Sequence, residues 1–408
     1  MQRSIASYVP SPHGKTLVGG EPLVFHCNYY NYFLQKTLLL DEQLEMEGVI
    51  HDAAQSSVYA LLTSAARERG AKTPEDRRQI AEHTFAQLGF GLIDFGAIGP
   101  DGGSVTVPMS HYGFALRPAA GNEFARPQSY FDAGYAAAAA AFIHGRPVES
   151  LAGTIEACMA MGAPAGKIAV APRPGFSPIL TPGIGAHTKE QPPAPFASNV
   201  DEAATLAALA TLDFSGNEEG LVPRFGVMLT HHFANFYNRI SFEFTRRMAD
   251  TGLLEAAEDL LVEGGLRCAF HTFGGIMTSG EWDAVIKPHC KTREDWVHGM
   301  VATVNALGWG VWRVVELAPD RLVMRIYDDY ESCGYLGMYG QAERPVSYLA
   351  AGGVAGLMNL VYVAKIDERP TLDFDCYSRV FESSERFTSQ HVKSMAGGDA
   401  YTEIVATR

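Results

Sequence analysis

The chain lacks any long apolar run, any paired cysteine framework and any basic leader. Its 408 residues include six scattered cysteines, none of them in a CxxC spacing. Such cysteines are typical of reduced thiols in the cytoplasm. No apolar stretch approaches the roughly 20 residues that span a bilayer, and residues 1–20 show no basic-then-apolar signal peptide. We therefore expect a cytoplasmic protein with no membrane partner.

Basic residues are also too few for several classes of partner. Thirty-two lysines and arginines face 46 acidic residues, a formal net charge of −14, and no dense basic run occurs. This balance argues against nucleic acid as a partner. The sequence has no GxxxxGK[ST], GxSxG or HExxH signature, and Gly89 and Gly91 lack the third glycine of a dinucleotide fingerprint. No cofactor is predicted. A metal held by His26, Asp94 and His111 is possible, but no ligand spacing supports it.

The most informative positive feature is an internal repeat. Residues 126–134 recur at 344–352 with six identities, an offset of 218. Residues 88–91 match 307–310 at an offset of 219, and residues 28–31 match 235–238 at 207. The offset of 218 also places Cys158 on Cys376. Because the matches keep their order and nearly constant spacing, they predict two homologous halves, a fused pseudo-dimer.

The expected elements follow the same order in both halves. In the first, Thr73-Pro74 is a helix start, followed by strands 90–95 and 104–107, a small-residue helix 132–143 and a closing hairpin 155–160 and 167–170. In the second, we expect helices 225–248 and 253–265, strands 311–317 and 322–327, and a helix 352–360. The pattern predicts an α+β fold, with helices packed on an antiparallel sheet, made twice. The expected domains are 1–171 and 201–408, joined by a proline-rich linker at 172–200.

Part of each half resembles a known family. Residues 134–135, 145–147 and 156–162, with 331–333 and 344–348 in the second half, resemble the 4-vinyl reductase domain. That family is similar to the ligand-binding part of phenol-responsive activators and to proteins assigned to bacteriochlorophyll vinyl reduction. The resemblance covers roughly residues 90–171 and, more faintly, 311–376. It implies a small, mostly apolar pocket.

The resemblance also implies that the zinc site of the sensor branch has decayed. Its first cysteine position is Ser129 in the first half and Ser347 in the second. Its glutamate position is Ile155, and its last cysteine position is Gly166. Only Cys158, and Cys376 in the second half, would remain. Because zinc needs about four nitrogen or sulfur ligands, we predict no zinc in this chain.

A polar stripe within an aromatic segment supplies the candidate ligand contacts. Asn28, Asn31 and Gln35 would share one face of a helix that also carries Tyr30. His231, Asn235 and Asn238 repeat the pattern in the second half. The stripe is either a hydrogen-bond network that holds the fold or a pair of ligand-orienting faces. We also expect Tyr130 and Tyr348, which begin the two small-residue helices, to contact a ligand held between residues 131–141 and the helix of Asn28.

Three residues are candidates for general acid or base catalysis: His26, His111 and Glu331. Each is equally compatible with a structural role. Cys27, beside His26, is either a reactive thiol or a buried structural one, and the recurrence of Cys158 at Cys376 indicates either redox chemistry or a small residue in a tight hairpin.

The sequence therefore predicts a duplicated 4-vinyl-reductase-like protein that binds a small apolar or aromatic molecule. With no output module visible, a free-standing enzyme of unknown reaction is the leading interpretation. The alternatives are a non-catalytic sensor or carrier subunit that acts on a separate partner, and an assembly protein that has lost binding. A homodimer is possible.

Overall fold

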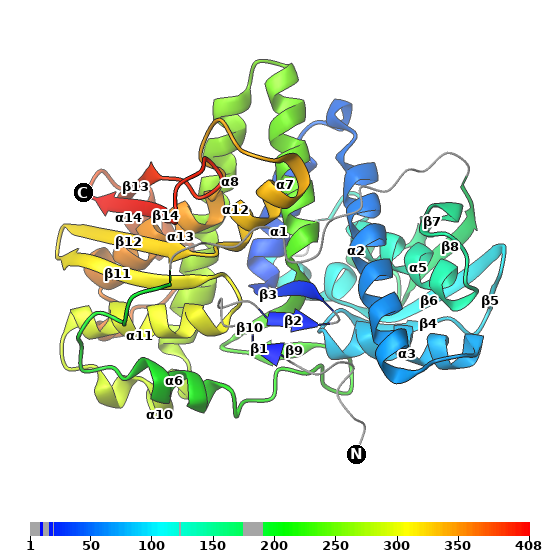
Figure 1. Cartoon of the computed structure of the whole chain (residues 1–408), viewed down its shortest axis with the longest axis horizontal. Coiled ribbons are helices and arrows are strands. Elements are labelled where there is room, and N and C mark those ends of the chain that lie inside the picture. The colour runs from blue at the N-terminus through cyan, green and yellow to red at the C-terminus, as the bar shows by residue number, and fades with distance from the viewer. Residues whose placement is uncertain (1–8, 11–15, 19, 122–123, 174–190) are drawn as a thin grey trace.

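The computed structural model describes residues 9–10, 16–18, 20–121, 124–173 and 191–408 (Figure 1). These residues form helices packed on three antiparallel sheets, so the predicted α+β class is confirmed. In this part of the chain, no helix is both long and apolar enough to cross a bilayer. Most of the predicted linker, residues 174–190 of 172–200, lies outside the described residues.

Half one, which we define as residues 21–172, contains one antiparallel sheet with helices packed on it. The sheet order is β4-β6-β8-β7, with β5 paired to β6. Its elements are β3 (Glu21–Cys27), α1 (Asn28–Leu38), α2 (Met46–Arg69), α3 (Pro74–Gln87), β4 (Gly91–Asp94), β5 (Ile98–Gly99), β6 (Gly102–Ser110), α5 (Tyr130–Ile143), β7 (Leu151–Ala157) and β8 (Gly166–Pro172).

Half two, residues 222–407, repeats this arrangement. Its sheet order β11-β12-β14-β13 corresponds strand by strand to that of half one. Its elements are β9 (Val222–Arg224), β10 (Val227–Phe233), α7 (Ala234–Asp250), α8 (Leu254–Cys268), α11 (Arg293–Ala306), β11 (Val311–Ala318), β12 (Arg321–Tyr327), α12 (Tyr330–Tyr339), α13 (Tyr348–Met358), α14 (Phe374–Phe381), β13 (Thr388–Lys393) and β14 (Thr402–Thr407). α6 (Glu202–Leu209) precedes it.

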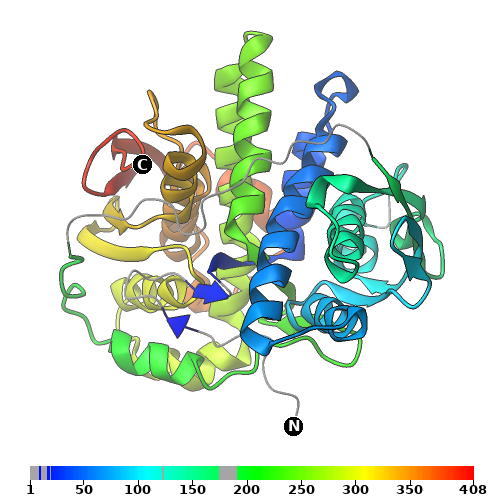
Figure 2. The same cartoon turned by 45° about the vertical axis from the view of Figure 1, so that its right-hand side comes forward.

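The two halves meet in a third sheet, ordered β1-β2-β3-β10-β9, where β1 is Val9–Pro10 and β2 is Thr16–Val18. β3 and β10 pair antiparallel, with Phe25 opposite His231. The halves also exchange matching backbone bonds: the Phe25 N–H donates to the Leu307 carbonyl at 3.0 Å, and the His231 N–H donates to the Leu88 carbonyl at 2.9 Å. The pairing is therefore reciprocal, as expected around an approximate twofold axis. Figures 1 and 2 show the sheet of half one and the sheet of half two on opposite sides, with α7 and α8 of half two between these sheets.

A glycine allows close helix packing in each half. α5 lies against α2, and α13 lies against α8. A Cβ at Gly134 would overlap the His51 carbonyl, and a Cβ at Gly352 would overlap the Val262 carbonyl. The two glycines are 218 residues apart. Each helix begins four residues before its glycine, at Tyr130 in α5 and Tyr348 in α13, so these tyrosines occupy corresponding topological positions.

Several predicted elements need correction. Residues 227–233 form strand β10, so the helix expected from 225 begins at Ala234. His26 lies on strand β3 rather than on a helix, because the seven residues of this strand are all buried in the shared sheet. By contrast, α3 begins at Pro74 with Thr73 as its cap, as the sequence predicts.

The match of Cys158 with Cys376 is also wrong. Cys158 follows β7, whereas Cys376 lies on α14, a helix that precedes the corresponding strand β13. The residue that follows β13 is Ser394. When Cys158 is aligned with Ser394, an offset of 236, the next two residues are Met-Ala in both halves. The extra length in half two displaces the true repeat, and the cysteine identity at 218 is a coincidence.

Candidate functional site

Buried polar side chains are concentrated where the halves meet. Several histidines and tyrosines from both halves, together with Asn31 and Thr230, are exposed by only a few per cent at this position. The ring-bearing members of this group, here named the central cluster, are His26, Tyr30, His111, Tyr112, His232, Tyr237 and Tyr330. Burying so many polar groups is costly unless they are hydrogen bonded to one another.

Two tyrosine–histidine contacts cross between the halves. Tyr112 of half one contacts His232 of half two, 3.0 Å from hydroxyl to Nε2. Tyr330 of half two contacts His26 of half one, at 3.4 Å. An aromatic ring lies beside each histidine, since the His232 ring is 4.9 Å from Phe90 and the His26 ring is 5.1 Å from Trp309. Phe90 and Trp309 correspond at the 219 offset, so the contacts are paired around the axis.

Asn31 links these side chains on the half-one side. The Tyr237 hydroxyl donates to Asn31 Oδ1 at 2.5 Å. Asn31 Nδ2 lies 2.9 Å from His111 Nε2 and donates to Thr230 Oγ1 at 3.3 Å. A contact of 2.5 Å fits an O–H···O bond rather than an N–H···O bond, for which about 2.9 Å is usual. The short contact therefore places the Asn31 carbonyl oxygen toward Tyr237 and its amino group toward His111.

This orientation fixes the proton on His111. Because the Asn31 amino group can only donate, His111 Nε2 accepts, and the neutral ring carries its hydrogen on Nδ1. His111 is fully buried, and its Nδ1 has no hydrogen-bond partner in the described part of the chain. A buried N–H donor without an acceptor costs roughly 1–3 kcal/mol. A water or a ligand oxygen at this position would remove that cost.

A small cavity adjoins Asn31 between α1 and α7. Its walls combine apolar side chains with two amides and two phenols: Asn31, Leu34, Gln35, Leu38, Ile50, Tyr112, Phe236, Tyr237 and Ile240. About 10 Å³ is open, the room that about one water occupies. Its lining comes from both halves and has the composition of a small-molecule site, but side chains must move before a ring can enter.

Burial keeps the histidines of the central cluster neutral. It lowers the pKa of His111 to about 3 and holds the pKa values of His26 and His232 well below their usual range. His231, which stacks on Phe25 with ring centres 4.0 Å apart, has its pKa lowered to about 3 for the same reason. These imidazoles are therefore hydrogen-bonding groups near neutral pH rather than charged ones.

The predicted acid Glu331 lies elsewhere. Its two carboxylate oxygens accept hydrogen bonds from the Leu349 and Ala350 amides, both at 3.1 Å, at the start of α13. Burial, with a contribution from Asp329, raises its pKa to about 8. A carboxyl in this position satisfies the orphan amides of a helix terminus, so the structure gives Glu331 a capping role at α13.

Most of the predicted stripe makes structural hydrogen bonds. Asn28 donates to the Ala115 carbonyl at 3.0 Å and accepts from the Met228 amide at 3.1 Å. Asn235 donates to Glu21 at 3.2 Å, and Asn238 donates to the Tyr330 carbonyl at 2.9 Å. Because His231 is on β10, it shares no helical face with Asn235. These contacts join the two helices to strands β3 and β10 and to other helical segments, which is the network interpretation of the stripe.

Tyr130 and Tyr348 lie away from the central cluster. Tyr130 is only half-buried, and the Tyr348 hydroxyl donates to Glu258 at 3.4 Å. The expected ligand position between α5 and α1 also differs from the packing, because α5 lies against α2 while α1 lies against α8. Of the predicted contacts, the structure brings together His26, Tyr30, Asn31 and His111.

Two of the decayed zinc positions are side by side. Ser129 Oγ lies 3.3 Å from Cys158 Sγ. Among the residues that the structure describes, no three histidine, cysteine or acidic side chains are grouped so as to hold a metal ion. Cys27, the other cysteine considered, accepts from Thr272 at 3.0 Å, and burial raises its pKa, which disfavours a reactive thiolate.

Sequence reasoning missed Tyr112, His232, Tyr237, Tyr330 and Thr230. The repeat contained the signal for most of them. Tyr30 and Tyr237 are 207 residues apart, Tyr112 and Tyr330 are 218 apart, and His26 and His232 are 206 apart. Identical polar aromatic residues at the repeat offsets therefore coincide with the buried centre of the pseudo-dimer.

No protein-family model matches the chain, and no curated protein matches it. Among solved structures, it is similar to the crystal structure of the phenol-responsive sensory domain of the transcription activator PoxR with phenol. The TM-score is 0.37 at 14% identity, over 52% of this chain and 91% of that chain. At this distance the likeness assigns neither a ligand nor an activity, and the 4-vinyl reductase resemblance stays a prediction.

Proposed function

We propose that the protein binds a small, neutral aromatic molecule bearing one oxygen, in the cavity between α1 and α7. The observation that carries the proposal is an apolar cavity with Asn31 in its wall, next to His111, a buried residue outside the lining with an unsatisfied donor. Leu34, Leu38 and Ile240 line the cavity together with Asn31, and Asn31 is bonded to His111, whose Nδ1–H lacks an acceptor among the described residues. Pockets of this kind bury an apolar body and orient it with a few polar groups.

Binding fits this arrangement better than acid–base catalysis. A general base works best when its pKa is near the working pH, whereas burial lowers the pKa of His111 to about 3. Glu331, whose pKa is raised to about 8, uses both of its oxygens on α13 amides. A sensor or carrier subunit is thus favoured over an enzyme that relies on His26, His111 or Glu331 as acid or base.

The cavity must open before it can bind a ring, because the present space holds about one water. The lining from α1 and α7 belongs to different halves, so a ligand would contact both. Binding would therefore stabilise the contact between the halves, and the free energy of unfolding should rise with ligand concentration.

Paired titrations with phenol and toluene, followed by calorimetry and NMR, test this proposal. We expect phenol to bind the unaltered chain more tightly than toluene, because only phenol offers an oxygen to the His111 donor. The variant His111→Ala should weaken phenol binding by about tenfold, the worth of one hydrogen bond of about 1.4 kcal/mol, and leave toluene unchanged. Ile240→Phe, which fills the cavity, should weaken both ligands.

Tyr130→Phe is the matched control, since Tyr130 is a half-buried phenol outside the cavity. It should bind both ligands as the unaltered chain does. If neither ligand binds, or if Ile240→Phe binds both with undiminished affinity, the cavity is not the binding site. Circular dichroism and thermal melting show whether each variant is folded.

A further inference from the structure

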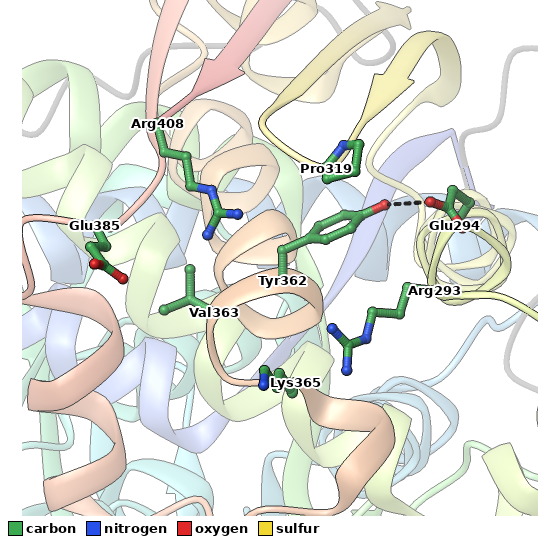
Figure 3. Close-up of a pocket in the computed structure, with 8 residues that line it drawn as sticks. All are labelled: Arg293, Glu294, Pro319, Tyr362, Val363, Lys365, Glu385 and Arg408. Atoms are coloured by element: carbon green, nitrogen blue, oxygen red, sulfur yellow. Dashed lines mark hydrogen bonds between the residues drawn. The ribbon is translucent and has the colours of Figure 1, made fainter.

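A second concave site lies on the outer side of half two, away from the central cluster. It encloses about 660 Å³, within the roughly 300–1,000 Å³ of small-molecule sites. Its lining comes from α11, the β11–β12 turn, the segment after α13 and the end of β14, and consists of Arg293, Glu294, Pro319, Tyr362, Val363, Lys365, Glu385 and Arg408. Figure 3 shows the three cationic side chains arranged around Tyr362 and Val363.

The three cations differ in how far they are neutralised. Arg293 directs Nε to Asp367 at 3.2 Å and Nη2 to Glu368 at 3.0 Å, and Nη1 has no partner among the described residues. Lys365 Nζ lies 4.0 Å from Glu368, the outer limit for an ion pair. Arg408 has no ion pair in the part of the chain that the structure describes.

Arg408 is instead held by an aromatic ring. Its guanidinium lies 5.2 Å from the centre of the Phe387 ring, a cation–π contact that leaves its N–H donors available. Of the two carboxylates in the lining, Glu294 already accepts from the Tyr362 hydroxyl at 3.3 Å. Glu385 is the other carboxylate, so three cationic side chains and two carboxylates line this pocket.

The backbone at Lys365 supports the same interpretation. Lys365 has φ 54° and ψ 59°, a left-handed conformation that costs a residue with a side chain roughly 1–2 kcal/mol. Glycine would adopt it without this cost, yet the position carries a lysine that lines the pocket. Strain held at a position of this kind is an indication of function.

We propose that this pocket binds a small organic anion with clustered anionic oxygens, such as a dicarboxylate or a phosphomonoester. Arg408 and the free Nη1 of Arg293 would donate to the oxygens, with Lys365 adding charge, and Tyr362 and Val363 would contact the carbon skeleton. Guanidinium groups suit carboxylate and phosphate because their paired N–H donors match the spacing of the oxygens. In a chain of formal net charge −14, such binding depends on local cations and should weaken as salt screens them.

Isothermal titration of the full chain with citrate, inorganic phosphate and glycerol tests this site. At low ionic strength we expect saturable binding of citrate or phosphate and none of glycerol. Arg408→Gln and Lys365→Gln should each weaken anion binding by about fivefold to tenfold. Arg321→Gln is the matched control, since Arg321 is on the neighbouring hairpin, pairs with Glu316 at 3.1 Å and does not line the pocket.

Citrate binding without phosphate binding would identify the ligand as a polycarboxylate, and the reverse would identify a phosphate compound; both support the site. The proposal fails if neither anion binds saturably at millimolar concentration. It also fails if Arg408→Gln, Lys365→Gln and Arg321→Gln bind the anions equally. All three substitutions are of partly exposed side chains, so folding should be retained, and a thermal melt of each variant checks this.

Discussion

Gly352→Ala is expected to lower the free energy of unfolding by about 3 kcal/mol or more, whereas Gly353→Ala should leave it within about 1 kcal/mol. The two glycines are neighbours on α13. A Cβ at Gly352 would overlap the backbone of α8 at Val262 and Leu266. A Cβ at Gly353 would be 3.4 Å from Trp312, an ordinary contact. Denaturant unfolding of both variants measures the difference.

The same experiment applies to half one. Gly134→Ala should be as damaging as Gly352→Ala, because its Cβ would overlap the His51 carbonyl of α2. Equal stabilities for Gly352→Ala and Gly353→Ala would show that α13 does not approach α8 as described here. A mild effect of Gly134→Ala beside a severe one of Gly352→Ala would contradict the equivalence of the two helix pairs.

The pH dependence of stability should show a maximum near pH 6.5. The buried histidines His26, His111, His231 and His232 and the partly buried His271 have folded pKa values below the 6.5 of a free imidazole. Between about pH 4 and 6.5 the unfolded chain therefore binds more protons at these groups, and stability rises with pH. The carboxyls with raised pKa values act in the opposite direction.

Those carboxyls are Glu21 and Asp132, each raised to about 7, and Glu331, raised to about 8, in every case chiefly by burial. Above their unfolded pKa values the folded chain holds protons that the unfolded chain has lost, so they reduce stability until pH passes about 8. Below pH 6.5 the five histidines outnumber the three carboxyls, so stability rises with pH. Above pH 6.5 only the carboxyls still bind different numbers of protons in the two states, so stability falls. Each unmatched proton changes stability by about 1.4 kcal/mol per pH unit.

Thermal melts from pH 4.5 to about pH 9 measure this profile. Asp132→Asn should steepen the rise between about pH 4.5 and 6.5 and flatten the decline just above it, because Asp132 holds its extra folded-state proton up to a pKa of about 7. A stability that rises steadily to pH 8 would mean that these carboxyls are ionised in the folded protein, and that their burial is less complete than described.

The repeat in the sequence predicted which helices correspond in the two halves, because it depends on residue identity rather than on periodicity. Tyr130 and Tyr348 begin corresponding helices, as the offset of 218 predicts. The strands β3 and β10 were not predicted, because β3 is buried along its whole length, β10 is buried at every residue except Met228, and neither shows polar alternation. A short, buried run of this kind cannot be told from a helix by its pattern, which is how His231 was placed in the expected helix 225–248.

Part of the candidate site could be predicted because some of its residues are polar side chains in an aromatic segment. Asn31 and His111 were singled out as unusual polar residues, and the structure brings them to 2.9 Å. Tyr112 and His232 could not be paired from sequence, since their contact depends on how the two halves cross at β3 and β10. Glu331 is buried, with its pKa raised to about 8, but its sequence context did not indicate that both of its oxygens accept from amides at the start of α13.

A crystal structure of the chain with phenol tests the central claim most directly. The account predicts a phenol ring between α1 and α7, in contact with Leu34 and Ile240, with its oxygen within hydrogen-bonding distance of His111 Nδ1. Phenol bound elsewhere on the chain, or a His111 Nδ1 that bonds a protein oxygen while the cavity stays closed, would contradict it.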